Sequence, residues 1–503
     1  MDDNKPQHEC GVIACVATGT WPTNLDVANI LALGLVGLQH RGQESAGIVT
    51  GKGNTEVSLE VHKGMGLVGN IFSPSVLSKL TGNLGIGHNR YSTQGSSTIS
   101  NCQPFVVEMS HGHIAVAHNG ELVNKGKLRQ QVLKRGVGLS SGSDSELIVQ
   151  LLCMSHPEEE QGLVDWTKRL KYLMQLTPTA YSIVLLHADT VYAVRDPLGN
   201  RPLCVGRLLS DPTGEDTSST LGYVVSSESC VFESMGGQLM YEIQPGEIMK
   251  VDRFGITSQG VVNTAQQHQA TAFCIFEYVY FSRSDSVLEG QMVYTARKQC
   301  GRILAVESPV VADIVGTVPD SAVPAAIGYA QQLNLPYDNL LARNRYIGRT
   351  FIQPSTRLRQ LAVAKKFAVL KDNVAGKRIV IVDDSIVRGT TMSSIISMLR
   401  SNGASEVHVR IASPPVKHPC YMGINIPTPD ELLANQLTNV TNIAQFIGAD
   451  SLAYLSVDGL RKAINKNIKQ QPVVVDDNTV KNKRSSGHCT ACLTAEYPVS
   501  LEW

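Results

Sequence analysis

The sequence has no excess of either charge, because its 503 residues include 44 lysines and arginines against 44 aspartates and glutamates. This balance argues against a generally basic nucleic-acid-binding protein, although it says nothing of local patches. No apolar run approaches the roughly 18 residues of a membrane span, and the polar start MDDNKPQHEC lacks a secretory hydrophobic region. We therefore expect a cytoplasmic protein with no membrane partner.

The chain also lacks internal repeats and long low-complexity tracts, so ordinary globular domains must account for its length. A chain of 503 residues with 43% hydrophobic composition predicts about two to four domains. Its 11 cysteines occur without a secretion signal. They are therefore expected to be thiols, metal ligands or a nucleophile rather than a disulfide framework.

The most informative stretch that is present is KRIVIVDDSIVRGTTMSS, residues 377–394. Its strand, Ile379–Val382, is apolar on both faces, which is typical of a buried parallel strand, and it ends in Asp383 and Asp384. Gly389 then lets backbone N–H groups approach an anion at the start of a helix. The pattern indicates a site for a phosphorylated sugar, with the carboxylates facing ribose hydroxyls or a divalent cation. The alternative is a buried strand that ends in a capped turn.

The order of elements changes along the chain. Residues 10 to about 250 alternate short strands with turns and include helical stretches near 24–38 and 145–154, which predicts a layered α+β domain. From about residue 305, strands followed by helices predict a doubly wound parallel sheet, in which Gly403 should end the helix that begins near Thr391. The boundary is expected in the polar segment 257–270. A second polar stretch, 476–488, leads to a cysteine-bearing tail.

Residues 343–366 carry seven basic side chains and no acid. A polyanionic substrate would explain this local concentration of charge. The alternatives are a solvated basic face or an RNA-binding patch, because clustered lysines and arginines are also the usual nucleic-acid footprint. Aromatic platforms for bases are sparse there, with Tyr346 and Phe351 within the segment.

Four motifs occur in order in the N-terminal half: HRGQESAGI at 40–48, HNRYSTQG at 88–95, HNGELVN at 118–124 and SGSDSE at 141–146. Together with Cys10 they resemble the glutaminase domain of the N-terminal nucleophile amidotransferases. The resemblance implies a four-layer αββα fold and cleavage between Glu9 and Cys10. A free α-amine, with a pKa of about 8, can accept the thiol proton, whereas an internal amide cannot.

The resemblance also assigns roles in the glutamine site. They are Cys10 as the nucleophile, Asn119 and Gly120 as the oxyanion hole, Arg90 for the carboxylate of glutamine, Asp144 for its ammonium, and Arg41 and Gly42 as lining residues. Each arginine taken alone would more often be a structural ion-pair residue. His88 and His118 are expected to pack or hydrogen bond, because the mechanism already has its base.

The stretch around Asp383 and Asp384 resembles the phosphoribosylpyrophosphate loop of type I phosphoribosyltransferases. With both halves, the chain resembles the glutamine phosphoribosylpyrophosphate amidotransferase family. The resemblance implies domains at 10–262 and 271–475 between a propeptide, 1–9, and a tail, 476–503. It implies formation of 5-phosphoribosylamine, glutamate and pyrophosphate, the first committed step of de novo purine synthesis. The implied substrate contacts are Arg349, Lys366, Asp383, Asp384, Ser385, Arg388, Gly389, Thr390 and Thr391, and the implied Mg²⁺ ligands are Ser321, Asp383 and Asp384.

The pair of cysteines in CTAC, 489–492, is weak evidence alone, since such a pair can bind zinc, transfer electrons or do neither. With Cys274 and Cys420, the resemblance implies that Cys489 and Cys492 hold a [4Fe-4S] cluster that pins the tail, and a structural zinc is the alternative. It also implies inhibition by purine nucleotides and a homodimer or homotetramer. Two other functions stay open here: a non-enzymatic regulator that binds RNA or a partner, and another glutamine-dependent synthase.

Overall fold

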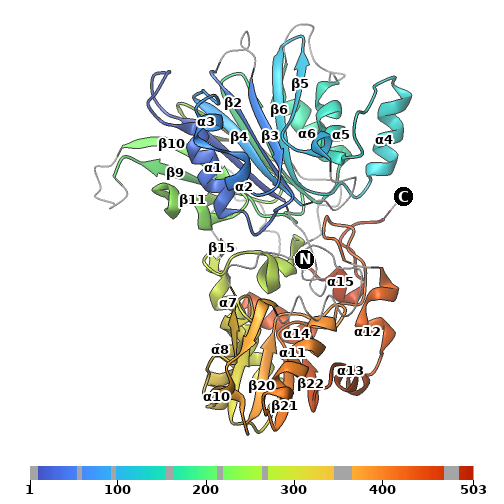
Figure 1. Cartoon of the computed structure of the whole chain (residues 1–503). Coiled ribbons are helices and arrows are strands. Elements are labelled where there is room, and N and C mark those ends of the chain that lie inside the picture. The colour runs from blue at the N-terminus through green and yellow to red at the C-terminus, as the bar shows by residue number, and fades with distance from the viewer. Residues whose placement is uncertain are drawn as a thin grey trace.

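The computed structural model describes residues 10–53, 59–91, 98–154, 164–211, 219–262, 270–344, 365–426, 428–468 and 487–501. The N-terminal and C-terminal halves lie one above the other in Figure 1. Within the described ranges, no helix combines the length and the apolar character needed to cross a bilayer.

Two antiparallel sheets form the N-terminal half. Among the described residues, one has seven strands in the order β11-β9-β10-β1-β4-β2-β3 and the other has six in the order β13-β12-β8-β7-β6-β5. The strands of the first are β1 (Gly11–Ala17), β2 (Ser45–Gly51), β3 (Glu60–Met65), β4 (Leu84–Arg90), β9 (Cys204–Leu209), β10 (Thr220–Ser226) and β11 (Gly237–Glu242). Those of the second are β5 (Phe105–Met109), β6 (Gly112–Gly120), β7 (Tyr181–His187), β8 (Thr190–Arg195), β12 (Glu247–Asp252) and β13 (Gly255–Val261).

Helices cover the outer faces of these two sheets. They are α1 (Val27–Gly37), α2 (Val68–Ile71), α3 (Pro74–Leu77), α4 (Lys125–Lys134), α5 (Asp144–Cys153) and α6 (Trp166–Leu176), with short 3-10 turns η1 (Ile99–Asn101), η2 (Ser229–Val231) and η3 (Glu233–Met235). Helices α1 and α5 confirm the helical stretches predicted near 24–38 and 145–154.

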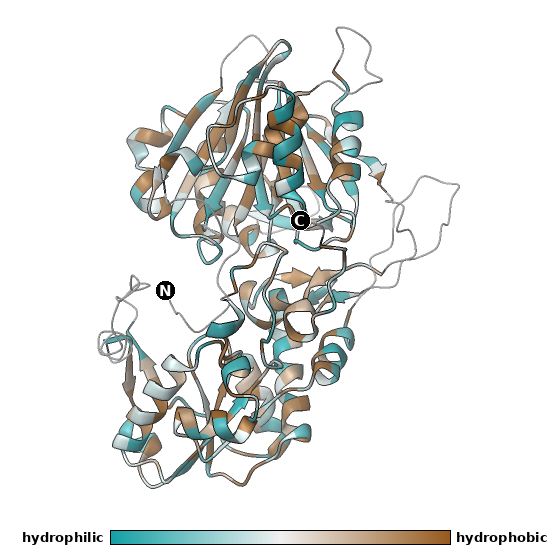
Figure 2. Cartoon of the chain, turned by 90° about the vertical axis from the view of Figure 1, so that its right-hand side faces the viewer, coloured by the Kyte–Doolittle hydropathy of each residue, from teal (hydrophilic) through white to brown (hydrophobic). Residues whose placement is uncertain are grey.

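The side-chain alternation of β1 explains the layering. Val12, Ala14 and Val16 enter the core between the two sheets, whereas Ile13 and Cys15 pack with α1 on the outer face. A third core joins the second sheet to α5 and α6. The four-layer αββα arrangement is therefore confirmed. Figure 2 shows helices with both hydrophilic and hydrophobic residues, as expected where one face of a helix meets a sheet.

The C-terminal half is built on a parallel sheet of order β17-β20-β21-β22. Its strands are β17 (Ile314–Thr317), β20 (Arg378–Asp383), β21 (Glu406–Ile411) and β22 (Ser451–Tyr454). The helices are α7 (Val293–Glu307), α8 (Val323–Leu333), α10 (Lys371–Val374), α11 (Thr390–Ser401), α12 (Leu433–Gln436), α13 (Val440–Ile447), α14 (Val457–Asn465) and α15 (Ala491–Thr494), with the 3-10 turn η5 (Pro429–Glu431).

Strand β20 is apolar on both faces because helices cover both. Val380 and Val382 belong to the core shared with α7, α8 and α14, and Ile379 and Ile381 belong to the core shared with α11 and α13. The doubly wound parallel sheet is therefore confirmed. Gly403, at φ 92°, follows the end of α11 as predicted.

The remaining described elements are short strands and one π-helix. They are the π-helix η4 (Glu277–Phe281), β14 (Phe273–Cys274), β15 (Val287–Leu288), β16 (Gln291–Met292), β18 (Leu341–Arg343), β19 (Phe367–Val369) and β23 (His488–Cys489). The polar segment 257–270, where we expected a boundary, starts inside β13 and continues into residues outside the described ranges.

Candidate active site

Cys10 lies immediately before β1 and is half-buried. Its Sγ is 3.8 Å from the backbone carbonyl oxygen of Tyr91, at the end of β4. Burial raises the pKa of the Cys10 thiol to about 11, and the positive charge of Arg90 opposes that rise. A thiol with this pKa is protonated at neutral pH, so it needs an adjacent base to become a nucleophile.

The turn that contains Asn119 and Gly120 ends strand β6. The side chain of Asn119 is fully buried, and neither its Nδ2 nor its Oδ1 has a hydrogen-bond partner among the described residues. Buried amides in native proteins are almost always paired, so this one is available for a ligand. Gly120 has a φ of 133°, and a Cβ there would lie 2.1 Å from the carbonyl oxygen of Ala180. Only glycine fits this turn.

Arg90 and Asp144, the two residues assigned to the charged groups of glutamine, come from different layers, a strand and a helix. Arg90 ends β4, and its Nη1 donates to Oε1 of Glu44 at 3.0 Å. Asp144 begins α5, and its Oδ2 accepts from the backbone N–H of Leu122 at 2.9 Å. Each charged group is therefore already held in place by a neighbour.

Arg41 is buried, and its guanidinium is engaged by protein groups. Its Nε donates to the carbonyl oxygen of Cys10 at 3.0 Å, and its amino groups form ion pairs with Glu228 and Glu277. The expected role of Arg41 in lining the glutamine pocket stays a prediction, and the structure shows that its guanidinium contacts the backbone of the proposed nucleophile. Gly42 packs closely on the backbone of Arg90, where a Cβ would lie 2.7 Å from its carbonyl carbon.

Sequence reasoning missed the two carboxylates that hold Arg41. Glu228 and Glu277 lie 187 and 236 residues from it in the sequence. The segment EYVYFSRSDS starts at Glu277, and nothing in its local pattern points to residue 41. No spacing rule could have paired it with residue 41.

His88 and His118 are buried and hydrogen-bonded, as expected. The Nε2 of His88 lies 3.1 Å from the carbonyl oxygen of His118, and the Nδ1 of His118 lies 3.1 Å from Oγ of Ser145. Burial lowers the pKa of His88 to about 3 and also lowers the pKa of His118. Both imidazoles are therefore neutral packing groups at physiological pH.

The second candidate site lies where β20 ends. Asp383 and Asp384 are buried, and the backbone N–H of Asp384 donates to Oδ1 of Asp383 at 2.9 Å. Hydroxyls from two loops reach Asp384: Ser321 donates to its Oδ2, and Ser385 donates to its Oδ1 at 2.8 Å. The structure thus brings together the three residues that the sequence proposes as Mg²⁺ ligands.

Helix α11 begins directly beyond these carboxylates. Gly389 precedes it at φ 77°, and Thr390 and Thr391 form its first turn. Helix α11 has 12 residues, and the backbone N–H groups in the first turn of a helix form a favourable environment for an anion. Arg388, next to the glycine, donates to Glu431 at 2.8 Å.

The basic segment 343–366 is described only at its ends. Arg343 forms an ion pair with Asp320, beside Ser321. The amino group of Lys366 lies 5.3 Å from the ring centroid of Phe367. Arg349 lies outside the described residues.

The four cysteines proposed as ligands come from separate short segments. Cys274 in β14 is aligned with Cys489 in the parallel strand β23, Cys492 lies in α15, and Cys420 accepts the N–H of Met422 through its Sγ at 3.3 Å. The pKa of each of the four thiols is raised, mainly because the thiols are buried. The raised pKa is about 11 for Cys274 and about 12 for Cys489. All 11 cysteines of the chain are free thiols.

Four thiols can serve one metal ion or a cluster of several. Among the described residues, no group of three or more histidine, cysteine, aspartate or glutamate side chains is arranged to hold a metal ion. The same four thiols nevertheless interact electrostatically with one another. Cys274 and Cys492 belong to one core cluster, Cys420 packs against it, and Cys489 is paired with Cys274, so the four segments are neighbours in the fold.

Comparison with known proteins decides the family. Residues 88–211 match the glutamine amidotransferase domain, and residues 307–414 match the phosphoribosyl transferase domain. The amidophosphoribosyltransferase of Rattus norvegicus is 55% identical, over 100% of this chain and 100% of its own length, and that of Homo sapiens is 55% identical over 99% and 98%. The chain belongs to the amidophosphoribosyltransferase family. It is thus a glutamine-dependent phosphoribosyltransferase.

Solved structures of this amidophosphoribosyltransferase family agree with the fold. The glutamine phosphoribosylpyrophosphate amidotransferase from B. subtilis, complexed with ADP and GMP, has a TM-score of 0.82 and 39% identity, with 98% of each chain covered. A structure described as the allosteric regulatory enzyme of purine biosynthesis has a TM-score of 0.83 and 40% identity, and covers 98% of this chain and 97% of its own.

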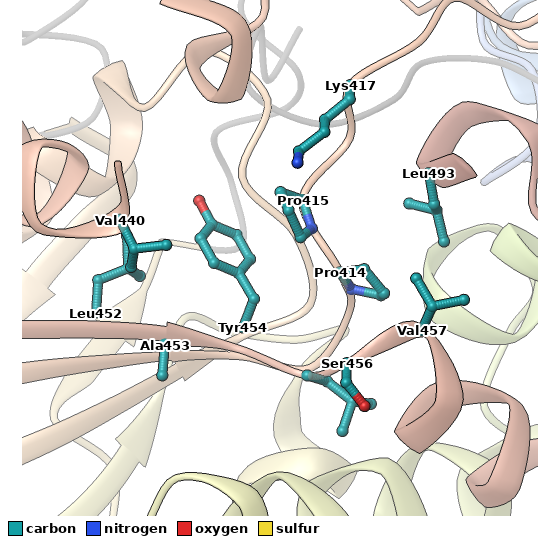
Figure 3. Close-up of a pocket in the computed structure, with 11 residues that line it drawn as sticks. Pro414, Pro415, Lys417, Val440, Leu452, Ala453, Tyr454, Ser456, Val457 and Leu493 are labelled. Atoms are coloured by element: carbon teal, nitrogen blue, oxygen red, sulfur yellow. The ribbon is translucent and has the colours of Figure 1, made fainter. Parts of the chain in front are cut away.

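One pocket of this family member shares no lining residue with either candidate site. It has a volume of about 410 Å³ and is lined by Pro414 and Pro415 after β21, residues 452–454 of β22, Val457 of α14 and Leu493 of α15. Figure 3 shows Tyr454 and Lys417 among mostly apolar side chains. The pocket contains none of the charged groups assigned to either substrate.

Proposed function

We propose that this chain transfers the amide nitrogen of glutamine to phosphoribosylpyrophosphate, releases glutamate and pyrophosphate, and so forms 5-phosphoribosylamine in the first committed step of de novo purine synthesis. The observation that carries this proposal is that one chain, with full-length amidophosphoribosyltransferase relatives, contains the candidate residues of both half-reactions. The first group includes Cys10 and the buried amide of Asn119, and the second includes the acidic end of β20 and the start of α11.

The glutaminase half would work as follows. Cleavage after Glu9 gives Cys10 a free amine that accepts the proton of its own thiol. The thiolate attacks the carboxamide carbon of glutamine, and the developing oxyanion accepts hydrogen bonds from Nδ2 of Asn119 and the backbone N–H of Gly120. Ammonia leaves, and water then hydrolyses the thioester. Residues 1–9 lie outside the described residues, so the state of this segment belongs to the proposal.

Arg90 and Asp144 would recognise the two charged groups of glutamine. A guanidinium binds a carboxylate through two parallel hydrogen bonds, and a carboxylate binds an ammonium. Both groups are anchored, by Glu44 and by the N–H of Leu122, and this anchoring favours a preformed pocket.

The transferase half would bind the phosphorylated sugar across β20 and α11. The N–H groups at Gly389, Thr390 and Thr391 suit the 5-phosphate, and Asp383 and Asp384 suit the ribose hydroxyls or the metal. Arg349 and Lys366, from the basic segment, would contact the pyrophosphate. By closing over the sugar, this segment would exclude water while ammonia, delivered internally from Cys10, attacks the anomeric carbon.

Oxygen ligands around Asp384 fit a magnesium ion. Ser321, Asp383 and Asp384 offer carboxylate and hydroxyl oxygens, the donors that Mg²⁺ prefers, and it usually completes its shell with water and phosphate oxygens. When bound, the ion would neutralise charge on the departing pyrophosphate. Ser385 would orient Asp384 through the hydrogen bond that its hydroxyl donates to the carboxylate.

Cys274, Cys420, Cys489 and Cys492 would hold a [4Fe-4S] cluster. The segments that carry the four cysteines are neighbours in the fold, which supports a shared site, and the resemblance to the family favours the cluster over the alternative, a single zinc ion. The cluster would pin the tail, because β23 and α15 carry two of the ligands.

Regulation, assembly and location complete the proposal. The relative from B. subtilis was solved with ADP and GMP, which supports inhibition of this chain by purine nucleotides. We further propose a homodimer or homotetramer in the cytoplasm, with no nucleic-acid or membrane partner.

Isotope transfer tests the function. Purified protein is supplied with phosphoribosylpyrophosphate, Mg²⁺ and glutamine labelled at the amide nitrogen, and the product is analysed by mass spectrometry. The label should appear on the pentose phosphate in equal amount to the glutamate released. Label that remains in glutamine would overturn the proposal, and binding of RNA by a chain that releases no glutamate would favour the regulator instead.

A further inference from the structure

Two segments of the C-terminal half pack against the proposed glutaminase site, one through Arg41 and the other on the backbone of Gly120. The first begins with Glu277, in the π-helix η4. Its carboxylate accepts from both amino groups of Arg41, at 2.9 and 3.1 Å. The Nε of the same guanidinium donates to the carbonyl oxygen of Cys10. Glu277 is therefore one residue removed from the backbone of the nucleophile.

The second contact is made by Gly423, three residues after Cys420. A Cβ on Gly423 would lie 3.0 Å from the backbone nitrogen of Glu121 and 3.0 Å from the carbonyl carbon of Gly120. The chain thus packs backbone against backbone on the turn that carries the oxyanion hole. Gly423 also has a φ of 90°, which side chains rarely adopt.

Arg201 joins the two contacts. It is fully buried, its Nη2 donates to the carbonyl oxygen of Met422 at 2.7 Å, and its Nη1 lies 3.8 Å from Oε1 of Glu277. A continuous buried path therefore runs from the carbonyl of Cys10 through Arg41, Glu277 and Arg201 to the residue before Gly423.

The path is rigid for physical reasons. Glu277, Arg41, Glu228 and Arg201 have no exposed side-chain surface, and together they carry two negative and two positive charges. Neutralising Glu277 leaves Arg41 paired with Glu228 alone and leaves the buried Arg201 without this carboxylate, so the group gains one excess positive charge, which is unfavourable. The remaining groups must then move or admit water. Either change would displace the backbone of Cys10.

We propose that Glu277 and Gly423, linked by Arg201, are positioning residues for glutamine hydrolysis. Glu277 orients the Cys10 backbone through Arg41, and Gly423 fixes the turn of Asn119 and Gly120. The C-terminal half is thus a structural part of the glutaminase site as well as the acceptor of its ammonia. This proposal rests on the glutaminase activity proposed above.

Steady-state kinetics of two variants, with glutamine and with ammonia, test it. Glu277→Gln keeps the shape and removes the charge, and Gly423→Ala adds the Cβ that the oxyanion turn excludes. In each, kcat for glutamine hydrolysis should fall by about tenfold or more while KM for glutamine changes by less than about threefold, because geometry rather than substrate contact is lost. Ammonia-dependent synthesis should stay within about twofold of the parent.

Gly376→Ala is the matched control for backbone strain. Gly376 also has a positive φ, 73°, but nothing lies within 4 Å of its added Cβ. This variant should keep both activities. Glu277→Asp, which restores the charge, should recover part of the kcat lost in Glu277→Gln.

The outcomes are distinct. A parent enzyme that hydrolyses no glutamine contradicts the proposed function itself. If the parent is active, a kcat within twofold of the parent in either variant overturns the positioning role of that residue. Equal loss of glutamine- and ammonia-dependent activity also overturns it, because the damage is then general.

Discussion

The backbone N–H of Leu122 donates to Oδ2 of Asp144 at 2.9 Å. Leu122 follows the turn of Asn119 and Gly120, and Asp144 begins helix α5. The carboxylate proposed to bind the ammonium of glutamine therefore also fixes the chain just beyond the oxyanion hole. With the proposed roles, Asp144 would serve both substrate binding and the geometry of the oxyanion hole, and substitutions at Asp144 can separate the two.

Asp144→Asn should raise KM for glutamine by about tenfold or more with a smaller change in kcat, because the amide oxygen still accepts from Leu122 but the negative charge is gone. Asp144→Ala removes both the hydrogen-bond acceptor for Leu122 and the negative charge, so it should lower kcat as well as raise KM. Initial rates of glutamate release over a range of glutamine concentrations measure the two constants. An unchanged KM in Asp144→Asn would contradict the ammonium-binding role.

The reactivity of Cys10 should depend on pH in a way that reveals its processing. In a chain that retains residues 1–9, burial holds the pKa of this thiol at about 11, above its ordinary value of 9.0. The raised pKa favours the neutral thiol, so the rate of alkylation should be low at pH 7 and rise about tenfold per unit up to pH 9.5. The same burial stabilises the fold while the thiol is neutral, and this contribution is lost as the pH rises from about 9 through about 11.

A chain that begins at Cys10 should be alkylated at least about ten times faster at pH 7.5, because the adjacent α-amine can take the proton. Mass spectrometry of the peptide that contains Cys10, after timed exposure to iodoacetamide, gives the rate. Cys204 is an internal control, since burial raises its pKa well above the ordinary value and it should stay unmodified. Equal rates in the two chains would show that the free amine is not the base.

Asp384→Asn should raise KM for phosphoribosylpyrophosphate by about tenfold or more at fixed Mg²⁺, because one charge of the proposed metal site is lost. Ser321→Ala removes only a hydroxyl and should have a smaller effect. Pyrophosphate release with ammonia as the nitrogen donor measures both without involving the glutaminase half. Ser394→Ala is the control, since that hydroxyl only donates to Thr390 within α11. If KM for phosphoribosylpyrophosphate is the same in Asp384→Asn and Ser394→Ala, Asp384 does not have the proposed role.

The elements that sequence predicts well are those whose signals are local. The apolar run before Asp383, the glycine at 389 and the stop at Gly403 each act over a few residues, and β20 and α11 follow them closely. The order of motifs around Cys10 and Asn119 also points to one site.

What sequence could not predict depends on contacts between distant segments. The ion pair of Arg41 with Glu277 spans 236 residues, and the packing of Gly423 on Gly120 needs the two halves in place. A buried arginine and a surface arginine look alike in a sequence. The burial of Arg41 and its contact with the carbonyl oxygen of Cys10 therefore become visible only in the fold.

The cysteine tail gives a prediction with a readout that is independent of activity. Cys489→Ser should lower the iron and sulfide of anaerobically purified protein to a small fraction of the parent, because a hydroxyl is a poor replacement for a thiolate ligand. β23 should then detach from β14, since Cys489 is aligned there with Cys274, and residues 487–501 should become more sensitive to proteases.

Cys300→Ser is the matched control, because Cys300 is also a buried free thiol but lies in α7, among the core residues of the parallel sheet. It should keep the iron and sulfide of the parent even if it loses some stability. Full iron content in Cys489→Ser would remove Cys489 from the ligand set. If the parent protein contains zinc instead of iron, the four cysteines hold a structural zinc ion and not a cluster. The tail should still detach when Cys489 is changed.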